Sequence, residues 1–347
     1  MVPLVNGRGL SGRVQKSSHL ARRNLAAGWL RHGLPPRTVA GTMEPSSDAS
    51  LEAWYGRFPE GWWGYHWSPP RPMSAVEIIG SGSVDARLMA TLWAVTSRRR
   101  SVMLASEAPM AGKTTTLSSL VDFLPPGTVG VFLRGWRGDF EWTDEIGPER
   151  GYVLVNEMSD HLPIYVWGRN ARGALELAGR GYGVGATMHA DSLDEAISLL
   201  RGQLGATDAD LAGLTIYLQY SAYRTPAGMY RRVEEAWHLR LDDGALAPVR
   251  LAALDGGRSP SLTGAQRDPE PPFLSGDGGR SSRPLIHEPA AYAVLAASLG
   301  LGADALEEEL AARSDYLAAL ADRGICDPAA VANALTRYPS LPEGAPA

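Results

Sequence analysis

The sequence predicts an α/β fold built on a mostly parallel sheet, and three observations support this class. Short apolar segments of strand length alternate with helical segments between residue 100 and about residue 239. These apolar segments are nearly continuous, which is typical of parallel strands buried on both faces. The chain has 347 residues, of which 44% are hydrophobic and 20% charged, so it is long enough to bury a sizeable core.

The predicted elements follow one another in a regular order. Two helical pieces within 74–98, separated by the "GSGS" of 80–83, precede the first strand. Helices are predicted after the first, third and fourth strands, and Ser192 with Glu195 predicts a capping box on the last of them. The predicted strands are 100–105, 128–135, 151–158, 182–190, 213–221 and 231–239, and the predicted helices are 113–124, 166–180 and 192–204.

Composition divides the chain into five regions. Residues 1–42 contain seven Lys and Arg but no Asp or Glu, and we interpret them as a disordered basic segment or as sequence upstream of a true start at Met43. A targeting peptide and a basic binding arm are the alternatives. Residues 43–72 are rich in aromatic side chains that either pin this segment to the core or form a ligand platform. The predicted core is 73–253, followed by a flexible linker, 254–285, and a small helical appendage, 286–340.

Composition also excludes several classes of protein. The single Cys326 rules out an intramolecular disulfide and a cysteine zinc cluster, which favours a reducing cytoplasm. No uninterrupted run of about 18 apolar residues occurs, so no transmembrane helix is expected. The net charge is −5 despite the basic start, so the rest of the chain is acidic and no nucleic-acid partner is expected.

The segment "SEAPMAGKTTT", residues 106–116, ends like a phosphate-binding loop. The full pattern is G-x-x-x-x-G-K-[ST], preceded by a strand and followed by a helix, as predicted here. Lys113 would reach the β- and γ-phosphate oxygens of ATP, and the Thr114 hydroxyl would ligate Mg²⁺. Backbone N–H groups and the helix dipole favour phosphate at this position. The predicted nucleotide-binding residues are Pro109, Met110, Ala111, Gly112, Lys113, Thr114 and Thr115; a helix start that matches by chance is the alternative.

Glu107 stands where the pattern has its first glycine. A carboxylate at this position predicts weakened rather than abolished phosphate binding. The side chain can point to solvent if the φ angle of Glu107 is negative, whereas a positive φ would strain the backbone by about 1 kcal/mol or more.

Two later strands end in residues suited to catalysis. Glu157 ends the apolar strand "GYVLVNEM" 44 residues after Lys113, where a carboxylate can handle the Mg²⁺ ion through water or orient the attacking water. Asp160 is a candidate helper, and a solvent-facing Glu157 is the alternative. His189 ends the next strand, and ligands bind at the carboxyl edge of open α/β sheets. In isolation, His189 is better explained by a structural role.

These three segments together resemble the ATPases of type II and type IV secretion and of pilus assembly, including the Tad pilus and archaellum motors. The family's phosphate loop reads roughly G-x-T-G-S-G-K-T-T, its Walker B segment V-G-E-x-R-D and its histidine box G-T-x-H-x-x-S. This sequence has "EAPMAGKTT", "VNEMSD" and "ATMHADS". The strand "RRVEEAWHL" (231–239) and the helical tail also resemble the family, so that the likeness covers about 75–337 except the linker.

The resemblance implies a RecA-like P-loop NTPase core that uses ATP and Mg²⁺. It implies catalytic roles for Glu157, which would polarise water, and for His189, which would contact the γ-phosphate region. It further implies a homo-hexamer that works with pilus or secretion apparatus proteins, in the cytoplasm or at the inner face of the membrane.

The sequence also departs from the family pattern. Besides Glu107, the Walker B glycine is Asn156 and the following arginine is Ser159. The family's acidic box is replaced by "GVFLRGWRGDFEW" (130–142), in which only Asp139 and Glu141 could stand in. The family's large N-terminal domain is reduced, and the arginines that complete the site could come from Arg134, Arg137 or the run 98–100.

The leading hypothesis is ATP binding with slow hydrolysis by a divergent motor. A non-catalytic, ATP-binding regulator or scaffold related to such a motor is the second hypothesis, favoured by Glu107 and the altered acidic box. A different P-loop enzyme, such as a small-molecule kinase, is the third, and the histidine box opposes it.

Overall fold

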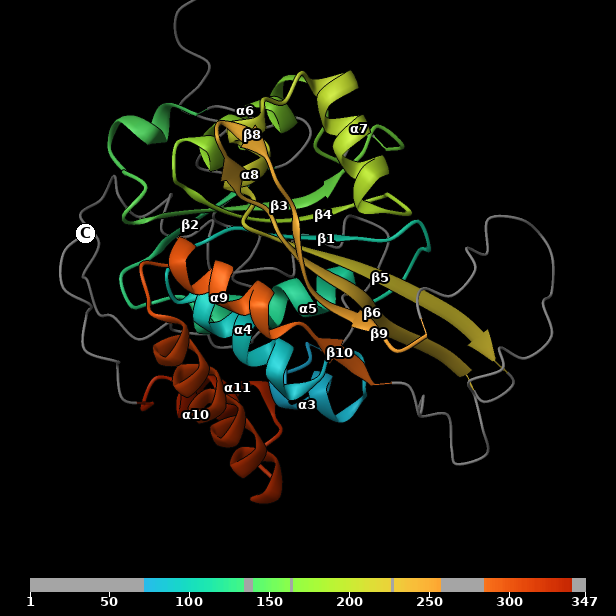
Figure 1. Cartoon of the computed structure of the whole chain (residues 1–347), viewed down its shortest axis with the longest axis vertical. Coiled ribbons are helices and arrows are strands. Elements are labelled where there is room, and N and C mark those ends of the chain that lie inside the picture. The colour runs from blue at the N-terminus through green and yellow to red at the C-terminus, as the bar shows by residue number, and fades with distance from the viewer. Residues whose placement is uncertain (1–71, 134–139, 163–164, 226–227, 257–283, 339–347) are drawn as a thin grey trace, which may run out of the picture. The chain divides into compact units, whose positions relative to one another are not determined.

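An eight-stranded sheet forms the centre of the described part of the protein (Figure 1). The structure is a computed structural model that describes residues 72–133, 140–162, 165–225, 228–256 and 284–338. The strand order is β10-β9-β6-β5-β1-β4-β3-β2. Its parallel strands are β1 (Val102–Ala105), β2 (Val129–Leu133), β3 (Gly151–Met158), β4 (Gly183–Met188) and β5 (Ile216–Thr225).

Three antiparallel strands extend the sheet beyond β5. They are β6 (Gly228–His238), β9 (Val249–Leu254) and β10 (Leu285–His287). A separate small hairpin joins β7 (Leu241–Asp242) to β8 (Ala245–Leu246). The mixed but mostly parallel sheet confirms the predicted α/β class. The basic and aromatic segments predicted for residues 1–71 lie outside the described residues, as does most of the predicted linker.

Helices cover both faces of the parallel strands because these strands are apolar on both sides. In β1, Val102 and Leu104 belong to one buried cluster, whereas Met103 and Ala105 belong to the other, as the two-residue period of a strand requires. One face packs against α6 (Arg169–Gly179), α7 (Leu193–Leu204) and α8 (Asp208–Gly213). The other packs against α3 (Ala75–Gly80), α4 (Ala86–Thr96), α5 (Lys113–Leu120), α9 (Pro289–Ser298), α10 (Ala303–Asp322) and α11 (Pro328–Leu335).

Side-chain caps set several helix starts. The predicted break at 80–83 separates α3 from α4, and the carboxylate of Asp85 accepts a hydrogen bond from the Leu88 N–H at 2.7 Å to begin α4. The Ser192 hydroxyl accepts from the Glu195 N–H at 3.2 Å at the start of α7. The predicted capping box is only half formed there, since the Glu195 carboxylate accepts from the Asp191 N–H instead.

The C-terminal helices share the core of the sheet. Side chains of α9, α10 and α11 belong to the same buried cluster as those of α4 and α5, and β10 pairs with β9. The predicted helical appendage is therefore packed directly on the core. Among the described helices none is by itself long and apolar enough to cross a membrane; α9 and α10 together, across a bend of 102°, reach such a length and composition.

Candidate functional site

The strand order brings the three predicted segments to one edge of the sheet. β4 lies between β1 and β3, and all three strands run parallel, so their carboxyl ends are neighbours. The Ser106 N–H, just after β1, donates a hydrogen bond to the Met188 carbonyl at the end of β4, at 3.2 Å. The loop 106–112, Glu157 and His189 therefore lie around the ends of three adjacent strands.

Lys113 is the first residue of α5, and its side chain is only 6% exposed. The ammonium Nζ donates a hydrogen bond to the Ser106 carbonyl at 3.0 Å and lies 3.9 Å from Oε1 of Glu157. Burial lowers the pKa of the Lys113 ammonium, while the charges of Glu157 and Glu107 act in the opposite direction. The chain has only two lysines among its 33 Lys and Arg residues, and one of them is at this position, where it provides a compact ammonium rather than a guanidinium.

Glu157 lies near the end of β3, where one of its carboxylate oxygens accepts a hydrogen bond and the other has no donor in the described part of the chain. Its Oε2 accepts a hydrogen bond from the Thr187 hydroxyl of β4 at 2.9 Å, and its carbonyl accepts from the Val166 N–H at 2.8 Å. Its Oε1 is buried and has no hydrogen-bond donor among the described residues. A buried carboxylate oxygen without a donor is costly, and a water or a hydrated Mg²⁺ would satisfy it. The residues present thus fit a nucleotide with its metal.

The loop residues with a left-handed backbone do not include Glu107. Within 106–112 the residues with positive φ are Met110 at 58° and Gly112 at 95°. Glu107 does not have a positive φ, and its side chain is exposed, so the backbone strain considered for it does not arise. Gly112 is the N-cap residue of α5, and the strain falls instead on Met110.

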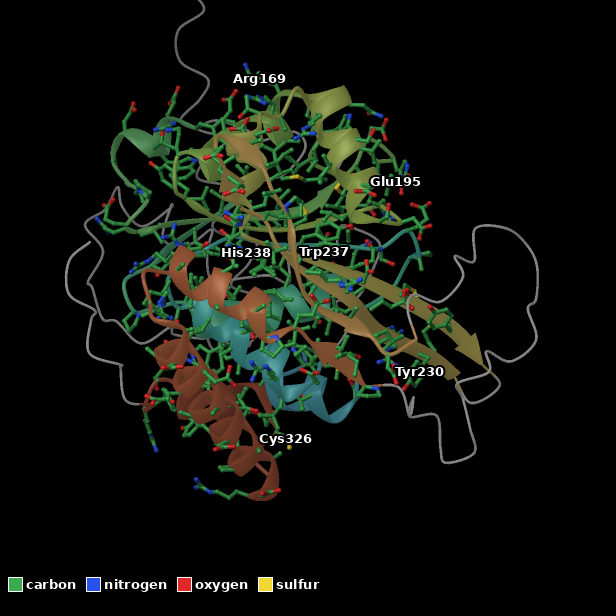
Figure 2. All side chains as sticks on the ribbon, in the orientation of Figure 1. Arg169, Glu195, Tyr230, Trp237, His238 and Cys326 are labelled. Carbon is green, nitrogen blue, oxygen red and sulfur yellow. The ribbon has the colours of Figure 1, made fainter. Side chains whose placement is uncertain are left out.

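Arg231, which the sequence interpretation missed, covers the loop from β6. Its Nε donates a hydrogen bond to the Met110 carbonyl at 2.6 Å, and a Cβ added at Gly112 would lie 3.5 Å from its Cδ. Ala105, the last residue of β1, pairs with Gln219, so β5 and β6 run on past the end of β1. Figure 2 shows the two ends of β6, with Tyr230 far along this hairpin and His238 near the middle of the molecule.

Of the arginines suggested by the sequence, Arg98 and Arg99 do not occupy this position. Arg98 donates two hydrogen bonds to Glu309, and Arg99 donates one to Thr128. Both precede β1 and therefore lie at the opposite edge of the sheet, while Arg134 and Arg137 fall outside the described residues. The sequence signal that could have found Arg231 is its place in the "RRV" strand.

Of the two acidic stand-ins, Glu141 is likewise not at the site. Asp139 lies outside the described residues, and Glu141 is exposed at the start of a 3-10 turn, Glu141–Asp144. The neighbouring Trp142 packs edge-on against Tyr182, which precedes β4, with ring centroids 5.5 Å apart. Glu141 is thereby placed towards the amino edge of the sheet, opposite Lys113.

His189 is half-buried just beyond β4, where it faces a second histidine. Its ring centroid lies 5.3 Å from that of His161, which follows β3. The next residue, Ala190, is fixed by a hydrogen bond from the Gln219 side chain to its carbonyl at 3.1 Å. Asp160 is 64% exposed and lies 4.0 Å from His161. No hydrogen bond to the His189 ring is made by the residues that the structure describes, so the ring is available to a ligand.

The remaining loop residues surround the start of α5. Pro109 and Met110 are exposed, Ala111 is buried, and Thr114 and Thr115 are half-buried in the first turn of the helix. The following Thr116 accepts a hydrogen bond from the Tyr220 hydroxyl of β5 at 2.8 Å, which ties the helix to the sheet.

Fold and site together define an α/β protein with a buried Lys–carboxylate pair where a loop enters a helix. In structure the chain is similar to the VirB11 ATPase of the Brucella suis type IV secretion system, solved in complex with sulphate, at 14% identity and a TM-score of 0.33. It is also similar to the Legionella pneumophila ATPase DotB, at 18% identity and a TM-score of 0.31. The first match covers 67% of this chain and 65% of VirB11, and the second covers 50% of this chain and 53% of DotB. The chain thus spans less than two thirds of either protein.

No protein-family model matches the sequence, and no curated protein matches it.

Proposed function

We propose that this protein binds ATP with Mg²⁺ at the carboxyl edge of its sheet and hydrolyses it slowly, as a divergent ATPase of the secretion and pilus-assembly type. The observation that carries this proposal is the buried pair of Lys113, which follows β1, and Glu157 of β3, whose charged atoms lie 3.9 Å apart although β4 lies between the two strands. Lys113 would bind the β- and γ-phosphate oxygens, and Thr114 would hold Mg²⁺. When bound, the metal neutralises charge that develops on the transferred phosphoryl group.

Lys113 is poised for an anion because its burial is costly without one. Taking an ammonium out of water is unfavourable, and its single carboxylate partner is at the limit of an ion pair. One of its three N–H donors goes to the Ser106 carbonyl, which leaves two for phosphate oxygens. Phosphate binding would therefore offset the cost of burying Lys113 and stabilise the folded protein.

Glu157 is arranged to orient a water molecule. The hydrogen bond from the Thr187 hydroxyl to Oε2 fixes the orientation of the carboxylate. The other oxygen, Oε1, lacks a donor among the described residues. A carboxylate held this way can accept a hydrogen bond from the attacking water and take its proton. His189, at the end of the intervening strand, would contact the γ-phosphate side of the same space.

By its sequence resemblance, the proposal extends to the setting of the enzyme. We infer a homo-hexamer that works with proteins of a pilus or secretion apparatus, in the cytoplasm or bound peripherally at the inner face of the membrane. The segments that support this are the phosphate loop, the histidine box and the "RRV" strand.

The test is ATP binding and turnover of the full chain beside two variants. We expect Lys113→Ala to lose ATP binding, because no other described residue offers an ammonium at the loop. We expect Glu157→Gln to keep ATP affinity within a few-fold but to lower kcat by at least about 100-fold. Glu145→Gln, an exposed carboxylate, is the matched control and should change neither quantity.

Two outcomes would contradict the proposal in different ways. Clear ATP binding with equal, background turnover in the wild type and Glu157→Gln would reject hydrolysis and leave an ATP-binding regulator or scaffold. Unchanged ATP binding in Lys113→Ala would reject both forms of the function.

A further inference from the structure

The β5–β6 hairpin is hydrogen-bonded to the candidate phosphate loop and its helix at two points. On β6, the Arg231 Nε donates a hydrogen bond to the Met110 carbonyl at 2.6 Å. On β5, the Tyr220 hydroxyl donates a hydrogen bond to the Thr116 hydroxyl at 2.8 Å. Residues 111–115, which hold most of the predicted phosphate-binding positions, lie between these two bonds. The hairpin therefore fixes both ends of this segment.

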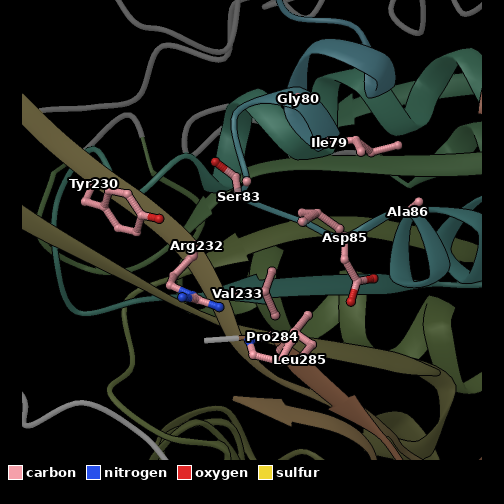
Figure 3. A pocket seen from close by; sticks show the side chains of 12 residues that line it. Ile79, Gly80, Ser83, Asp85, Ala86, Tyr230, Arg232, Val233, Pro284 and Leu285 are labelled. Carbon is pink, nitrogen blue, oxygen red and sulfur yellow. The ribbon is translucent and has the colours of Figure 1, made fainter. Parts of the chain in front are cut away.

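Arg231 is the residue of its part of β6 that faces the loop. Its neighbours Tyr230 and Arg232 line a cavity next to the α3–α4 connection, and side chains alternate between the two faces along a strand (Figure 3). The strand itself is anchored there, because the Val233 N–H donates a hydrogen bond to the Ser83 carbonyl at 2.8 Å. Arg231 thus extends towards the loop from a fixed position on the opposite face of the strand.

Met110 needs a contact that holds its backbone. Its φ angle is 58°, which is left-handed, although it is not a glycine and is 58% exposed. A residue with a Cβ adopts this conformation only at a cost in free energy, and keeps it where the surrounding structure holds it there. Among the described residues, Arg231 makes the one hydrogen bond to the Met110 backbone. This bond therefore stabilises the left-handed turn.

The turn at Met110 leads into backbone that is arranged for an anion. Gly112 is left-handed, with φ 95° and ψ 2°, and Lys113 after it is helical. Successive N–H groups in such a pair of conformations form a concavity that binds anions. No carbonyl in the described part of the chain accepts a hydrogen bond from the N–H groups of Gly112, Lys113 or Thr114. The Arg231 stem packs on the same segment, since a Cβ added at Gly112 would lie 3.5 Å from its Cδ.

We infer that Arg231 is a positioning residue for phosphate binding. By holding the Met110 carbonyl, it keeps the loop in the shape in which the N–H groups of residues 112–114 face an anion. The inference rests on the proposed function, because it takes the phosphate site at Lys113 as its starting point. Without Arg231, the loop must adopt its left-handed turn unaided, so phosphate affinity falls while Lys113 and Glu157 stay in place.

The experiment compares variants of the full chain by calorimetric titration with Mg²⁺·ATP. Arg231→Met keeps an aliphatic stem but removes the Nε donor, and we expect it to weaken ATP binding about tenfold, because a hydrogen bond from a charged group is lost. Arg250→Met is the matched control and should change ATP affinity less than twofold. Arg250 also donates a hydrogen bond through its Nε, to Glu288 at 2.9 Å, but it lies on β9.

Substitutions at Met110 separate positioning from a general loss of structure or of positive charge. Glycine adopts a positive φ without strain, whereas alanine removes the same side chain but keeps the Cβ that disfavours this conformation. In the Arg231→Met background, we expect Met110→Gly to restore ATP affinity at least threefold and Met110→Ala to restore none. With Arg231 present, both substitutions at Met110 should change ATP affinity less than threefold.

Two kinds of result would overturn the inference. Wild-type affinity in Arg231→Met, or a glycine at position 110 that restores no more affinity than alanine, would show that Arg231 does not act through the turn. The proposed function would survive either result if Lys113→Ala still lost ATP binding. A wild type that does not bind ATP would instead reject the phosphate site, and the role of Arg231 with it.

Discussion

Glu107 acts on the loop through its charge. Its backbone is not left-handed, so a glycine at this position offers no relief of strain. Its carboxylate is close enough to favour the charged form of Lys113, and it is exposed at the mouth of the loop. A phosphate arriving at Lys113 therefore meets a like charge.

We expect Glu107→Gly to tighten ATP binding a few-fold, and Glu107→Gln to do the same because it removes the charge without freeing the backbone. The gain should shrink as salt is raised, since the carboxylate is exposed and its field is screened over about 10 Å at 0.1 M. Titrations with ATP at low and high salt measure both effects. Unchanged or weaker affinity in both variants would show that Glu107 is neutral or has a role of its own.

The sequence predicts those site residues that lie at the ends of parallel strands, and misses the contacts that depend on the length of a hairpin. Lys113, Glu157 and His189 could be predicted to meet, because each ends or follows a strand of one parallel sheet. Arg231 could be assigned to the "RRV" strand, but its contact with Met110 could not be predicted, because that contact depends on how far the β5–β6 hairpin runs past β1. The left-handed φ of Met110 could not be predicted either, because a glycine is the usual sequence signal for a positive φ and none stands at this position.

At the scale of elements, α4 and α10 are joined by a buried charge cluster. Both oxygens of Glu309 accept hydrogen bonds from Arg98 at 2.8 Å, and Arg313 lies 2.7 Å from the same carboxylate. The Arg313 guanidinium also lies over the Trp93 ring, 4.6 Å from its centre. Burial lowers the pKa of Arg313, while the charge of Glu309 acts in the opposite direction.

We expect Glu309→Gln to lower the free energy of unfolding by about 3 kcal/mol, because it leaves the buried Arg313 and the half-buried Arg98 without a counter-charge. Glu308→Gln, one position along and exposed, is the control and should change stability by less than about 0.5 kcal/mol. Denaturant unfolding of both variants measures the difference. Equal stability of the two would show that Arg98 and Arg313 find other partners.

The sequence predicted the helices and strands better than it predicted which of them pack against one another. The strand predicted at 151–158 is β3 itself, and the helices of 74–98 break where "GSGS" suggested. The C-terminal helices were predicted as an appendage because a Gly- and Pro-rich segment precedes them. Their apolar faces gave no sign of their partners, which are α4 for α10, β9 for α9 and α3 for α11.

On the scale of the whole molecule, His238 joins three distant parts of the chain. Its Nδ1 lies 3.0 Å from the Thr215 carbonyl before β5, and its Nε2 lies 2.7 Å from the Ser298 hydroxyl at the end of α9. A carbonyl only accepts, so the neutral ring carries its proton on Nδ1 and accepts from Ser298 through Nε2. Burial, and secondarily Arg240, lower the pKa of His238, while the bond to Thr215 opposes them.

The folded protein therefore resists protonation of His238 more than the unfolded chain does. The stability from this residue is present above about pH 6.5, the pKa of an unfolded histidine, and is lost as the pH falls towards the lower folded pKa. We expect the melting temperature to drop between pH 7.5 and pH 5.5, and to drop less in His238→Asn, which keeps a donor near Nδ1 but does not titrate. Equal drops in the two proteins would contradict this.

The two faces of the sheet also differ in when they can be completed. The buried residues of the face under α6, α7 and α8 are all made by residue 239, whereas the opposite face needs α3 and α4 together with α9 to α11. Ser74 donates a hydrogen bond to the Cys326 carbonyl, 252 positions later. During synthesis on the ribosome, one side of the sheet is therefore closed early, while the apolar surface of α4 stays uncovered until the last helices emerge.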